Sequence, residues 1–218
     1  MPSRPDLPAL YAILDADAAA AQSADPVALL DLWLSHDIRL VQLRAKSLDS
    51  ARFFDLARRL ASRVSSAGGT FIVNDRADIA RLAGARGVHV GQDDLSPIDV
   101  RQIAGPQAII GLSTHDDAQL RDAIGTPIDY VAIGPVFETR TKGAAASATV
   151  GLDGVRRAAS QARERGVPLV AIGGITLATA RAVLDAGAQS VAVIADLLAG
   201  DPAARAKAYR DALDLGKP

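Results

Sequence analysis

Short apolar runs rich in valine and isoleucine recur along the whole chain, and stretches that mix charged and apolar residues separate them. Within a run the apolar residues are mostly continuous rather than alternating, which is typical of parallel strands with both faces buried. Such runs, when they alternate with helical patterns, indicate βα units. The pattern predicts strands at Ala9–Leu14, Ile38–Leu43, Thr70–Val73, Gly87–Val90, Ala108–Leu112, Tyr130–Ile133, Leu169–Ile172 and Ser190–Ile194.

Helical periodicity fills the intervals between these runs. In Ser50–Ser66 the apolar side chains recur at helical spacing, arginines occupy the other faces, and Asp49 stands where a cap is expected. Proline is favoured at the first position of a helix and glycine just beyond the last one. These signals predict helices that begin at Asp25-Pro26, Ser96-Pro97 and Asp201-Pro202, and one over Thr176–Ala186 that ends at Gly187.

Strands that alternate with helices form either a closed barrel or an open, doubly wound sheet. A glycine-rich phosphate turn after the first strand would favour the open sheet, but the chain has Leu14-Asp15-Ala16-Asp17 there. We therefore predict an α/β fold, a single (β/α)8 TIM barrel over residues 1–218, with flexible ends at 1–7 and 215–218. The longest loop, Gly134–Gly151, is expected to be functional because long loops in compact domains usually are.

Composition narrows the classes of function. Basic residues number 24 and acidic residues 25, so no charge excess indicates nucleic acid or an anionic membrane as a partner. The chain has no cysteine, which excludes disulfides and thiolate chemistry. Met1–Pro8 lacks the pattern of a signal peptide, and no apolar run approaches the roughly 20 residues that span a bilayer. We expect a cytoplasmic protein with small-molecule partners, and homo-oligomer formation stays open.

Polar residues gather where the predicted strands end, which is where barrels of this kind place their functional groups. The second strand ends in Gln42, Arg44 and Lys46, which alternation puts on one side. One amide and two cations suit a polyanionic ligand, because Arg presents a planar fork and Lys a point charge to phosphate oxygens. The alternative is a solvated strand end with ordinary surface charge.

Two carboxylates follow neighbouring strands, Asp75 after the third and Asp94 after the fourth. Mg²⁺ prefers few carboxylates together with water and substrate phosphate oxygens, so this pair could share one ion. The alternative is that each residue caps the helix that follows. That alternative is strongest for Asp94, close to Ser96-Pro97, while Asp93 is expected to be a plain surface residue.

The fifth strand leads into Ser113 and Thr114, whose hydroxyls either bind a ligand or cap the helix that begins near Asp116. Among the histidines, His36 is expected at the surface of a helix-to-strand connection and His89 inside the barrel.

His115 is the histidine nearest the predicted site, where it either starts a helix or takes part in catalysis.

The loops after the last three strands carry phosphate-binding features. Thr139, Arg140, Thr141 and Lys142 form a group of hydroxyls and cations that is typical of a phosphate-binding lid, or else of an exposed loop. Gly173-Gly174 follows the seventh strand, and Ile194-Ala195 ends the eighth. Loops after strands seven and eight are the common phosphate site of TIM barrels.

Together these motifs resemble the thiamine phosphate synthase family. The resemblance runs from Tyr11 to about Leu198, and each motif follows the expected strand in the family's order. The motifs that carry it are Gln42–Lys46, Asn74-Asp75-Arg76, His89–Asp94, Gly111–His115, Gly134–Lys142 and Ala171–Ile175.

The resemblance implies a transferase of thiamine biosynthesis that joins a hydroxymethylpyrimidine diphosphate to a thiazole phosphate and releases pyrophosphate. It implies Mg²⁺ as cofactor, held by Asp75 and Asp94. It also implies catalytic roles for Arg44, Lys46, Ser113 and Lys142. The substrate-binding positions it implies are Gln42, Leu43, Arg44, Ala45, Lys46, Asn74, Ser113, Thr139, Arg140, Thr141, Lys142, Gly173, Gly174, Ile194 and Ala195.

Two positions depart from the family's pattern, since Ala45 stands where Glu is frequent and Ala195 where Ser is frequent. A thiazole tautomerase on the same barrel is the first alternative, although that relative tends to carry His at the position of Pro135 and needs no diphosphate site. A non-catalytic sensor of thiamine phosphates is the second alternative. A sensor has no reason to keep a clamp for a leaving group.

Overall fold

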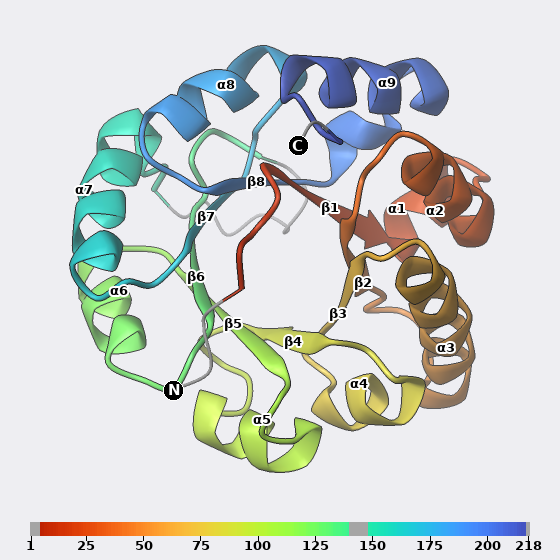
Figure 1. Cartoon of the computed structure of the whole chain (residues 1–218), viewed down its shortest axis with the longest axis horizontal. Helices are drawn as coiled ribbons and strands as arrows, with labels where there is room; N and C mark the ends of the chain where they lie inside the picture. The colour runs from red at the N-terminus through yellow and green to blue at the C-terminus, as the bar shows by residue number, and fades with distance from the viewer. Residues whose placement is uncertain (1–4, 140–147, 217–218) are drawn as a thin grey trace.

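Eight parallel strands close into a barrel in the order of the sequence, with helices around the outside, in a computed structural model that describes residues 5–139 and 148–216 (Figure 1). Each strand pairs with the next, and β1 pairs with β8 to close the ring. The predicted TIM barrel is confirmed. The strands are β1 Leu10–Asp15, β2 Leu40–Arg44, β3 Thr70–Asn74, β4 Gly87–Val90, β5 Ile109–Thr114, β6 Tyr130–Ile133, β7 Leu169–Ile172 and β8 Ser190–Val193.

The predicted strands agree closely with the observed ones. The bounds of β4, β6 and β7 are as predicted, and the others differ by a residue or two at their ends, where strands fray. β2 begins later than expected, because Ile38 belongs to the connection that precedes it, and it extends to include Arg44. The predicted flexible ends stay a prediction, since 1–4 and 217–218 lie outside the described residues.

Helices follow the strands around the barrel. Asp49, Asp25, Ser96 and Asp201 each accept a backbone N–H at the start of a helix, so these predicted caps are confirmed. The helices are α1 Ala16–Ala21, α2 Pro26–Ser35, α3 Ser50–Ser66, α4 Ala77–Ala83, α5 Pro97–Ala104, α6 Asp117–Ile124, α7 Gly151–Glu164, α8 Leu177–Asp185, the 3-10 turn η1 Ala195–Leu198, and α9 Pro202–Ala212.

The helix α1 was not predicted. α1 begins directly after β1, in the segment that the sequence suggested was a turn followed by an alanine run. Asp15 caps it by accepting hydrogen bonds from the backbone N–H groups of Asp17 (3.0 Å) and Ala18 (2.9 Å). The helix is therefore stabilised by a cap and by alanine propensity rather than by amphipathic periodicity.

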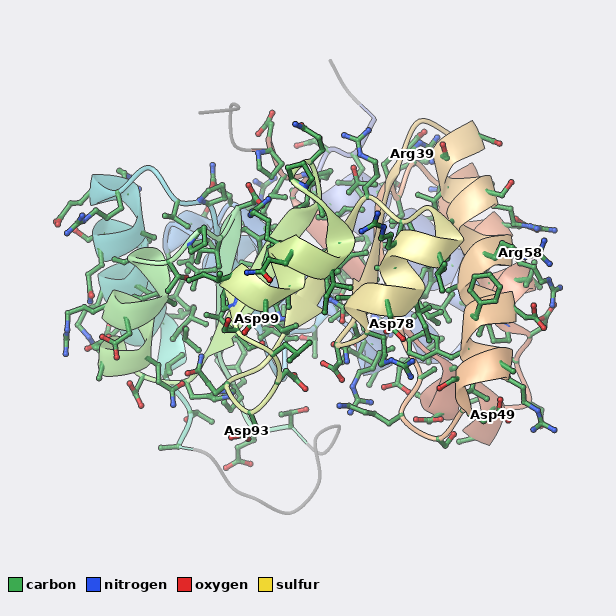
Figure 2. All side chains as sticks on the ribbon, turned by 90° about the horizontal axis from the view of Figure 1, so that it is seen from below. Arg39, Asp49, Arg58, Asp78, Asp93 and Asp99 are labelled. Carbon is green, nitrogen blue, oxygen red and sulfur yellow. The ribbon has the colours of Figure 1, made fainter. Side chains whose placement is uncertain are left out.

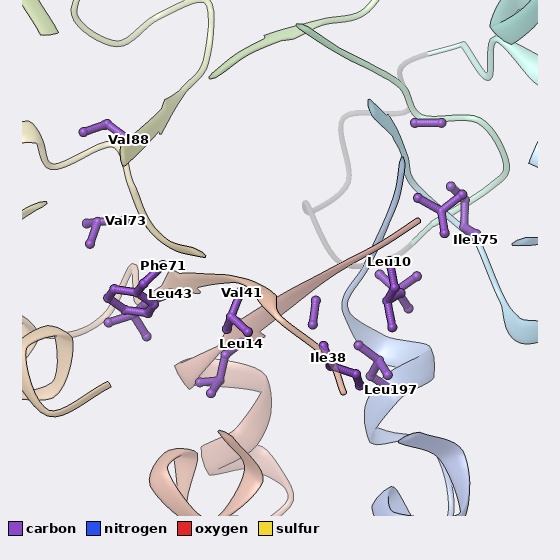
Figure 3. Close-up of a cluster of buried hydrophobic side chains, with 14 of the residues drawn as sticks. Leu10, Leu14, Ile38, Val41, Leu43, Phe71, Val73, Val88, Ile175 and Leu197 are labelled. Atoms are coloured by element: carbon purple, nitrogen blue, oxygen red, sulfur yellow. The ribbon is translucent and has the colours of Figure 1, made fainter. Parts of the chain in front are cut away.

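The alternation of side chains along the strands divides the core into two layers. Tyr11, Ile13 and Ile72 belong to a cluster inside the barrel, whereas the intervening positions belong to a larger cluster between the strands and the helices. Figure 3 shows part of the outer cluster. It includes Leu43 of β2 and Val73 of the neighbouring strand β3, and both side chains are buried. Both faces of the strands are buried, as the continuous apolar runs predicted.

The two ends of the barrel differ. In the side view of Figure 2, Arg39 lies at the edge where β2 begins, and Asp93 lies at the opposite edge, just after β4 ends. Asp49, the cap of α3, lies toward the same edge as Asp93. The carboxyl ends of the strands and the starts of the helices that follow them therefore share one edge. None of the helices in the described ranges is both long enough and apolar enough to cross a bilayer.

Candidate active site

A cavity of about 480 Å³ opens at the carboxyl ends of the strands. It is lined by inward-facing side chains of the strands and by residues that directly follow them. Most of the predicted polar residues reach it, which places them in one site. The predicted residues that line the cavity are Gln42, Arg44, Lys46, Asn74, Asp75, Asp94, Ser113 and Ile194.

The end of β2 contributes three polar side chains to the cavity. Gln42, Arg44 and Lys46 all line it, so the predicted alternation of side chains is confirmed. The alternative, that these residues form an ordinary charged strand end at the surface, is not confirmed. The two residues between them face the other way. Leu43 and Ala45 are buried in the layer between strands and helices, which leaves only their backbone atoms for a role in binding.

Arg44 is held by a residue that the sequence analysis did not assign to the site. Its guanidinium forms an ion pair with the carboxylate of Asp15 at the end of β1. The Asp15 side chain is 4% exposed and that of Arg44 is 19% exposed, so water screens this pair weakly. Asp15 also caps α1. The signal was present in the sequence, since Asp15 is the first acidic residue after a strand.

Asp75 sits at the mouth of the cavity in a left-handed backbone conformation with φ of 62°. This region is unfavourable for residues other than glycine and is best tolerated by Asn and Asp. The backbone N–H of Asp75 donates to the carbonyl of His89 on β4 (2.8 Å), which helps hold the turn. The observed strain at this position is of the kind that clusters at functional sites.

Two charged neighbours act on the Asp75 carboxylate. Burial raises its pKa, the ammonium of Lys46 (2.5 Å) opposes that rise, and the Asp94 carboxylate adds to it. The two carboxyl groups are therefore close enough to repel each other. Neither residue caps a helix: Asp94 accepts from the backbone N–H of Gly91 (2.8 Å), and Ser96 caps α5. The helix-cap alternative for both residues was wrong.

The remaining predicted side chains of β3 and β4 take different directions. Asn74 lines the cavity, but Arg76 turns away from it to pair with Asp78 and with the hydroxyl of Ser50. Gln92, which was not assigned a role, lines the cavity and donates to the carbonyl of Ser113 (2.6 Å). Asp93 is exposed, as predicted, and lies at the rim.

The hydroxyls at the end of β5 do not cap α6. Asp116 caps that helix, so the alternative role for Ser113 and Thr114 was wrong. Thr114 donates to the carbonyl of Ala132 (2.9 Å) on β6 and is buried. Ser113 is 6% exposed and lies at the cavity surface.

The histidines were predicted with mixed success. His89 is buried and faces the cavity, as expected. His115 also lines the cavity and bonds through Nδ1 to the carbonyl of Gly134 (2.6 Å), so it does not start a helix. His36 was expected at the surface, but it is half-buried at the end of α2, where it is the C-cap residue.

Four of the side chains that line the cavity are joined, through Tyr130, by a continuous chain of buried hydrogen bonds. Gln42 donates to the Tyr11 hydroxyl (2.7 Å), which bonds the Tyr130 hydroxyl (2.9 Å). Tyr130 bonds Nδ1 of His89 (2.9 Å), and Nε2 of His89 bonds the Ser113 hydroxyl (2.8 Å). Burial raises the pKa of Tyr11 and of Tyr130 well above the usual phenol range. Both phenols therefore stay protonated at neutral pH.

The loop after β7 is built for close backbone approach. Gly173 and Gly174 have positive φ values of 100° and 66°. A Cβ on Gly173 would lie 2.6 Å from Pro135, and one on Gly174 would lie 2.5 Å from the carbonyl oxygen of Glu138. The glycines thus allow the loop after β6 to pack directly on the loop after β7, and only glycine fits there.

The predicted lid is only partly described. Thr139 is half-buried, and Arg140, Thr141 and Lys142 lie outside the described residues. At the end of β8, Ile194 lines the cavity and Ala195 begins η1. Asp196, which was not assigned a role, accepts from the backbone N–H of Leu177 at the start of α8 (2.9 Å) and so ties the two loops together.

No cluster of three or more His, Cys, Asp or Glu side chains suited to a metal occurs within residues 5–139 and 148–216. The Asp75 and Asp94 carboxylates lie close to each other at the mouth of the cavity. Two repelling carboxylates with open sides are a suitable donor set for Mg²⁺, which keeps several waters and takes phosphate oxygens as further ligands. The residues present therefore fit that ion.

Comparison with known proteins places this geometry in a family. The sequence profile of a family described as thiamine monophosphate synthase matches residues 10–197. The chain is 44% identical to a thiamine-phosphate synthase of Koribacter versatilis, over 93% of this chain and 94% of the relative. It is 41% identical to a thiamine-phosphate synthase of Mycobacterium sp. (strain JLS), over 89% of each chain.

A solved structure gives the same result. The thiamine phosphate pyrophosphorylase of Pyrococcus furiosus superposes with a TM-score of 0.83 at 28% identity, covering 94% of this chain and 95% of that one. The chain belongs to the thiamine monophosphate synthase family.

Proposed function

We propose that this chain joins 4-amino-2-methyl-5-hydroxymethylpyrimidine diphosphate to 4-methyl-5-(2-phosphoethyl)thiazole, releasing pyrophosphate and forming thiamine monophosphate. It is a transferase of thiamine biosynthesis, since its relatives are thiamine-phosphate synthases over nearly its whole length. The observation that carries the assignment of the site is the gathering of Arg44, Lys46, Asp75 and Asp94 at one mouth.

One half of the mouth suits the diphosphate. Arg44 and Lys46 project from β2 toward the cavity and present a planar fork and a point charge to an anion. Gln42, Asn74 and Ser113 complete this half with neutral hydrogen-bonding groups. Lys142 lies outside the described residues, and the family resemblance assigns it to this half. Cations at this place stabilise the negative charge that develops on pyrophosphate as it leaves.

The other half suits the thiazole phosphate. Gly173 and Gly174 carry no side chains, so a ligand can approach their backbone closely. The backbone at Ile194-Ala195 lies at the start of η1. Backbone N–H groups of such turns bind phosphate well, and Ala195 needs no hydroxyl for that purpose. The family resemblance assigns the hydroxyls of Thr139 and Thr141 and the cation of Arg140 to this half, although Arg140 and Thr141 lie outside the described residues.

Mg²⁺ is the cofactor that the donor set fits, held by Asp75 and Asp94. When bound, the ion would neutralise charge on the diphosphate and so make it a better leaving group. Lys46 already neutralises part of the charge of Asp75.

The proposed reaction requires little proton transfer. A pyrimidine cation that forms as pyrophosphate leaves needs stabilised leaving-group charge and a nucleophile held in position. The cations of the first half supply the stabilisation, and the phosphate loops of the second half hold the thiazole. This division explains why the cavity has cations and hydroxyls at its mouth, whereas one of its two described histidines, His89, is bonded at both ring nitrogens.

The test is a two-substrate assay with purified protein, both phosphorylated substrates and Mg²⁺. We expect release of pyrophosphate and formation of thiamine monophosphate in equal amounts, and no product when either substrate is left out. An Asp75→Ala variant should be slowed severely in the chemical step. Absence of product from the wild-type protein under these conditions would refute the assigned reaction, and near-normal turnover by the variant would refute the role of Asp75.

A further inference from the structure

Five buried polar side chains, four of which line the cavity, form one unbroken chain of hydrogen bonds, and no step of the proposed reaction uses the three in the middle. The chain runs from Gln42 on β2 through Tyr11, Tyr130 and His89 to Ser113 on β5, with contacts of 2.7, 2.9, 2.9 and 2.8 Å. All five side chains are at most 7% exposed. Its two ends are the only members assigned to substrate binding.

The fold holds the middle of the chain rigidly. The His89 ring stacks on the Tyr130 ring with centroids 5.5 Å apart and planes 22° apart, and the Tyr11 ring meets Tyr130 edge-on at 6.0 Å. Gly111 lies beside Tyr130 in the barrel register, and a Cβ there would lie 2.0 Å from the ring. Glycine at position 111 therefore leaves the space that the Tyr130 ring and hydroxyl occupy.

The amide of Gln42 sets the direction of the chain. Its Nε2 donates to Tyr11, so the single proton of the Tyr11 hydroxyl goes to Tyr130. The proton of Tyr130 then goes to Nδ1 of His89, which must be the unprotonated nitrogen. Neutral His89 consequently carries its proton on Nε2 and donates it to the oxygen of Ser113.

This direction determines what each end offers to a ligand. Ser113 receives a hydrogen bond, so its own proton is available as a donor toward the cavity that it lines. Gln42 uses an N–H toward Tyr11, so its carbonyl oxygen is available as an acceptor. If the Gln42 amide were turned over, every hydrogen bond in the chain would reverse. The Ser113 hydroxyl would then donate its proton to His89 and could only accept a hydrogen bond from a ligand.

We propose that Tyr130 is a positioning residue that, through the tautomer of His89, fixes the Ser113 hydroxyl as a hydrogen-bond donor to the pyrimidine diphosphate. Tyr11 passes on, from the other end of the same chain, the direction that the Gln42 amide sets. The proposal rests on the proposed function for the identity of the ligand. The direction of the chain is a property of the free protein and is tested without any substrate.

The first experiment is a long-range ¹H–¹⁵N spectrum of the histidine rings of the free protein at neutral pH. The His89 signals are assigned by their loss in His89→Gln. We expect a proton on Nε2 and a hydrogen-bonded, unprotonated Nδ1. Tyr130→Phe should move the Nδ1 resonance toward that of an unbonded nitrogen. Tyr209→Phe is the matched control and should leave it in place, because the Tyr209 hydroxyl bonds Asp196 and takes no part in this chain.

A proton on Nδ1 in the wild-type protein would overturn the proposed direction. An Nδ1 resonance that is the same in Tyr130→Phe and the wild type would overturn the role of Tyr130. Urea denaturation checks that each variant is folded. Phenylalanine keeps the ring contacts in both cases, so a cooperative transition is expected.

The second experiment is a double-variant cycle on kcat. We expect Ser113→Ala to lower kcat about a hundredfold, as loss of an oriented donor does, and Tyr130→Phe to lower it about tenfold. If Tyr130 acts through Ser113, then the double variant is no slower than Ser113→Ala alone. Multiplied losses in the double variant would overturn the proposal. Full activity of Ser113→Ala would also overturn it, and the assigned reaction itself would still stand.

Discussion

The buried ion pair between Asp15 and Arg44 allows a prediction about stability and activity together. Asp15→Ala removes three interactions of one carboxylate: the pair with Arg44 and the two backbone N–H groups at the start of α1. Asp15→Asn removes the negative charge but keeps a side-chain oxygen for the helix cap. The two variants therefore separate the ion pair from the cap.

The magnitudes follow from the exposure of the partners. Breaking a fully buried pair costs about 3 to 5 kcal/mol, because a charge is left unpaired. Arg44 is 19% exposed and lies beside the cavity, so water relieves part of this cost. We expect Asp15→Asn to lower the free energy of unfolding by about 2 kcal/mol. Loss of the cap adds about 1 kcal/mol in Asp15→Ala, and a chain of this size loses about 2 to 4 °C of Tm per kcal/mol.

Urea denaturation of the wild type and both variants measures these differences. The matched control is Asp55→Ala, which removes a helix-surface partner of Arg58 at 4.0 Å with both side chains more than 60% exposed. It should change the free energy of unfolding by at most about 0.5 kcal/mol and leave kcat/KM unchanged.

Kinetics complete the test. Asp15→Asn should lower kcat/KM for the pyrimidine diphosphate about tenfold, because Arg44 loses the partner that holds it at the mouth. If Asp15→Asn is as stable as the wild type, or if Asp55→Ala is equally destabilised, then the argument from burial is wrong. Normal kcat/KM in Asp15→Asn would show that Arg44 needs no such support.

Three further predictions concern other parts of the mouth. Asp94→Asn relieves the repulsion on Asp75 and keeps the acceptor for Gly91, so the free energy of unfolding without added Mg²⁺ should rise by about 0.5 kcal/mol while turnover falls; lower stability in urea would contradict this. Gly174→Ala should raise KM for the thiazole phosphate at least tenfold through its clash with the preceding loop, whereas Gly84→Ala, also at positive φ but with nothing within 4 Å, should leave KM unchanged. Lys142→Ala should lower the single-turnover rate about a hundredfold because it removes a cation from the leaving group; a rate within threefold of the wild type would exclude that role.

The fold was largely predictable because its signals are local. Capping residues and prolines marked the helix starts, and continuous apolar runs marked strands buried on both faces. α1 was missed because its alanines carry no periodicity, and its cap, Asp15, was interpreted as part of a turn. The late start of β2 was missed because Ile38 is apolar and buried without belonging to the sheet.

The site was predictable where polar residues interrupt a strand end, as at Gln42, Arg44 and Asp75. The residues that were missed fall into two kinds. Asp15 stands at the same kind of strand end and could have been found by the same rule. Tyr11 and Tyr130 lie inside apolar runs, where an aromatic residue looks like core packing, and only the barrel register brings their hydroxyls together at 2.9 Å.

The two cations of β2 are held in different ways, and the difference has a physical consequence for ligand binding. Arg44 is paired with a carboxylate that is 4% exposed and also serves as a helix cap, so separating the two would leave a buried charge unpaired. Lys46 is 56% exposed and is paired with Asp75 at the open mouth, where water screens the interaction and exchange is inexpensive. We therefore expect an incoming diphosphate to bind Arg44 without displacing Asp15, because the guanidinium has further N–H donors, and to replace Asp75 as the partner of Lys46. On this proposal the mouth combines one cation that is fixed before the substrate arrives with one that changes partner as it binds.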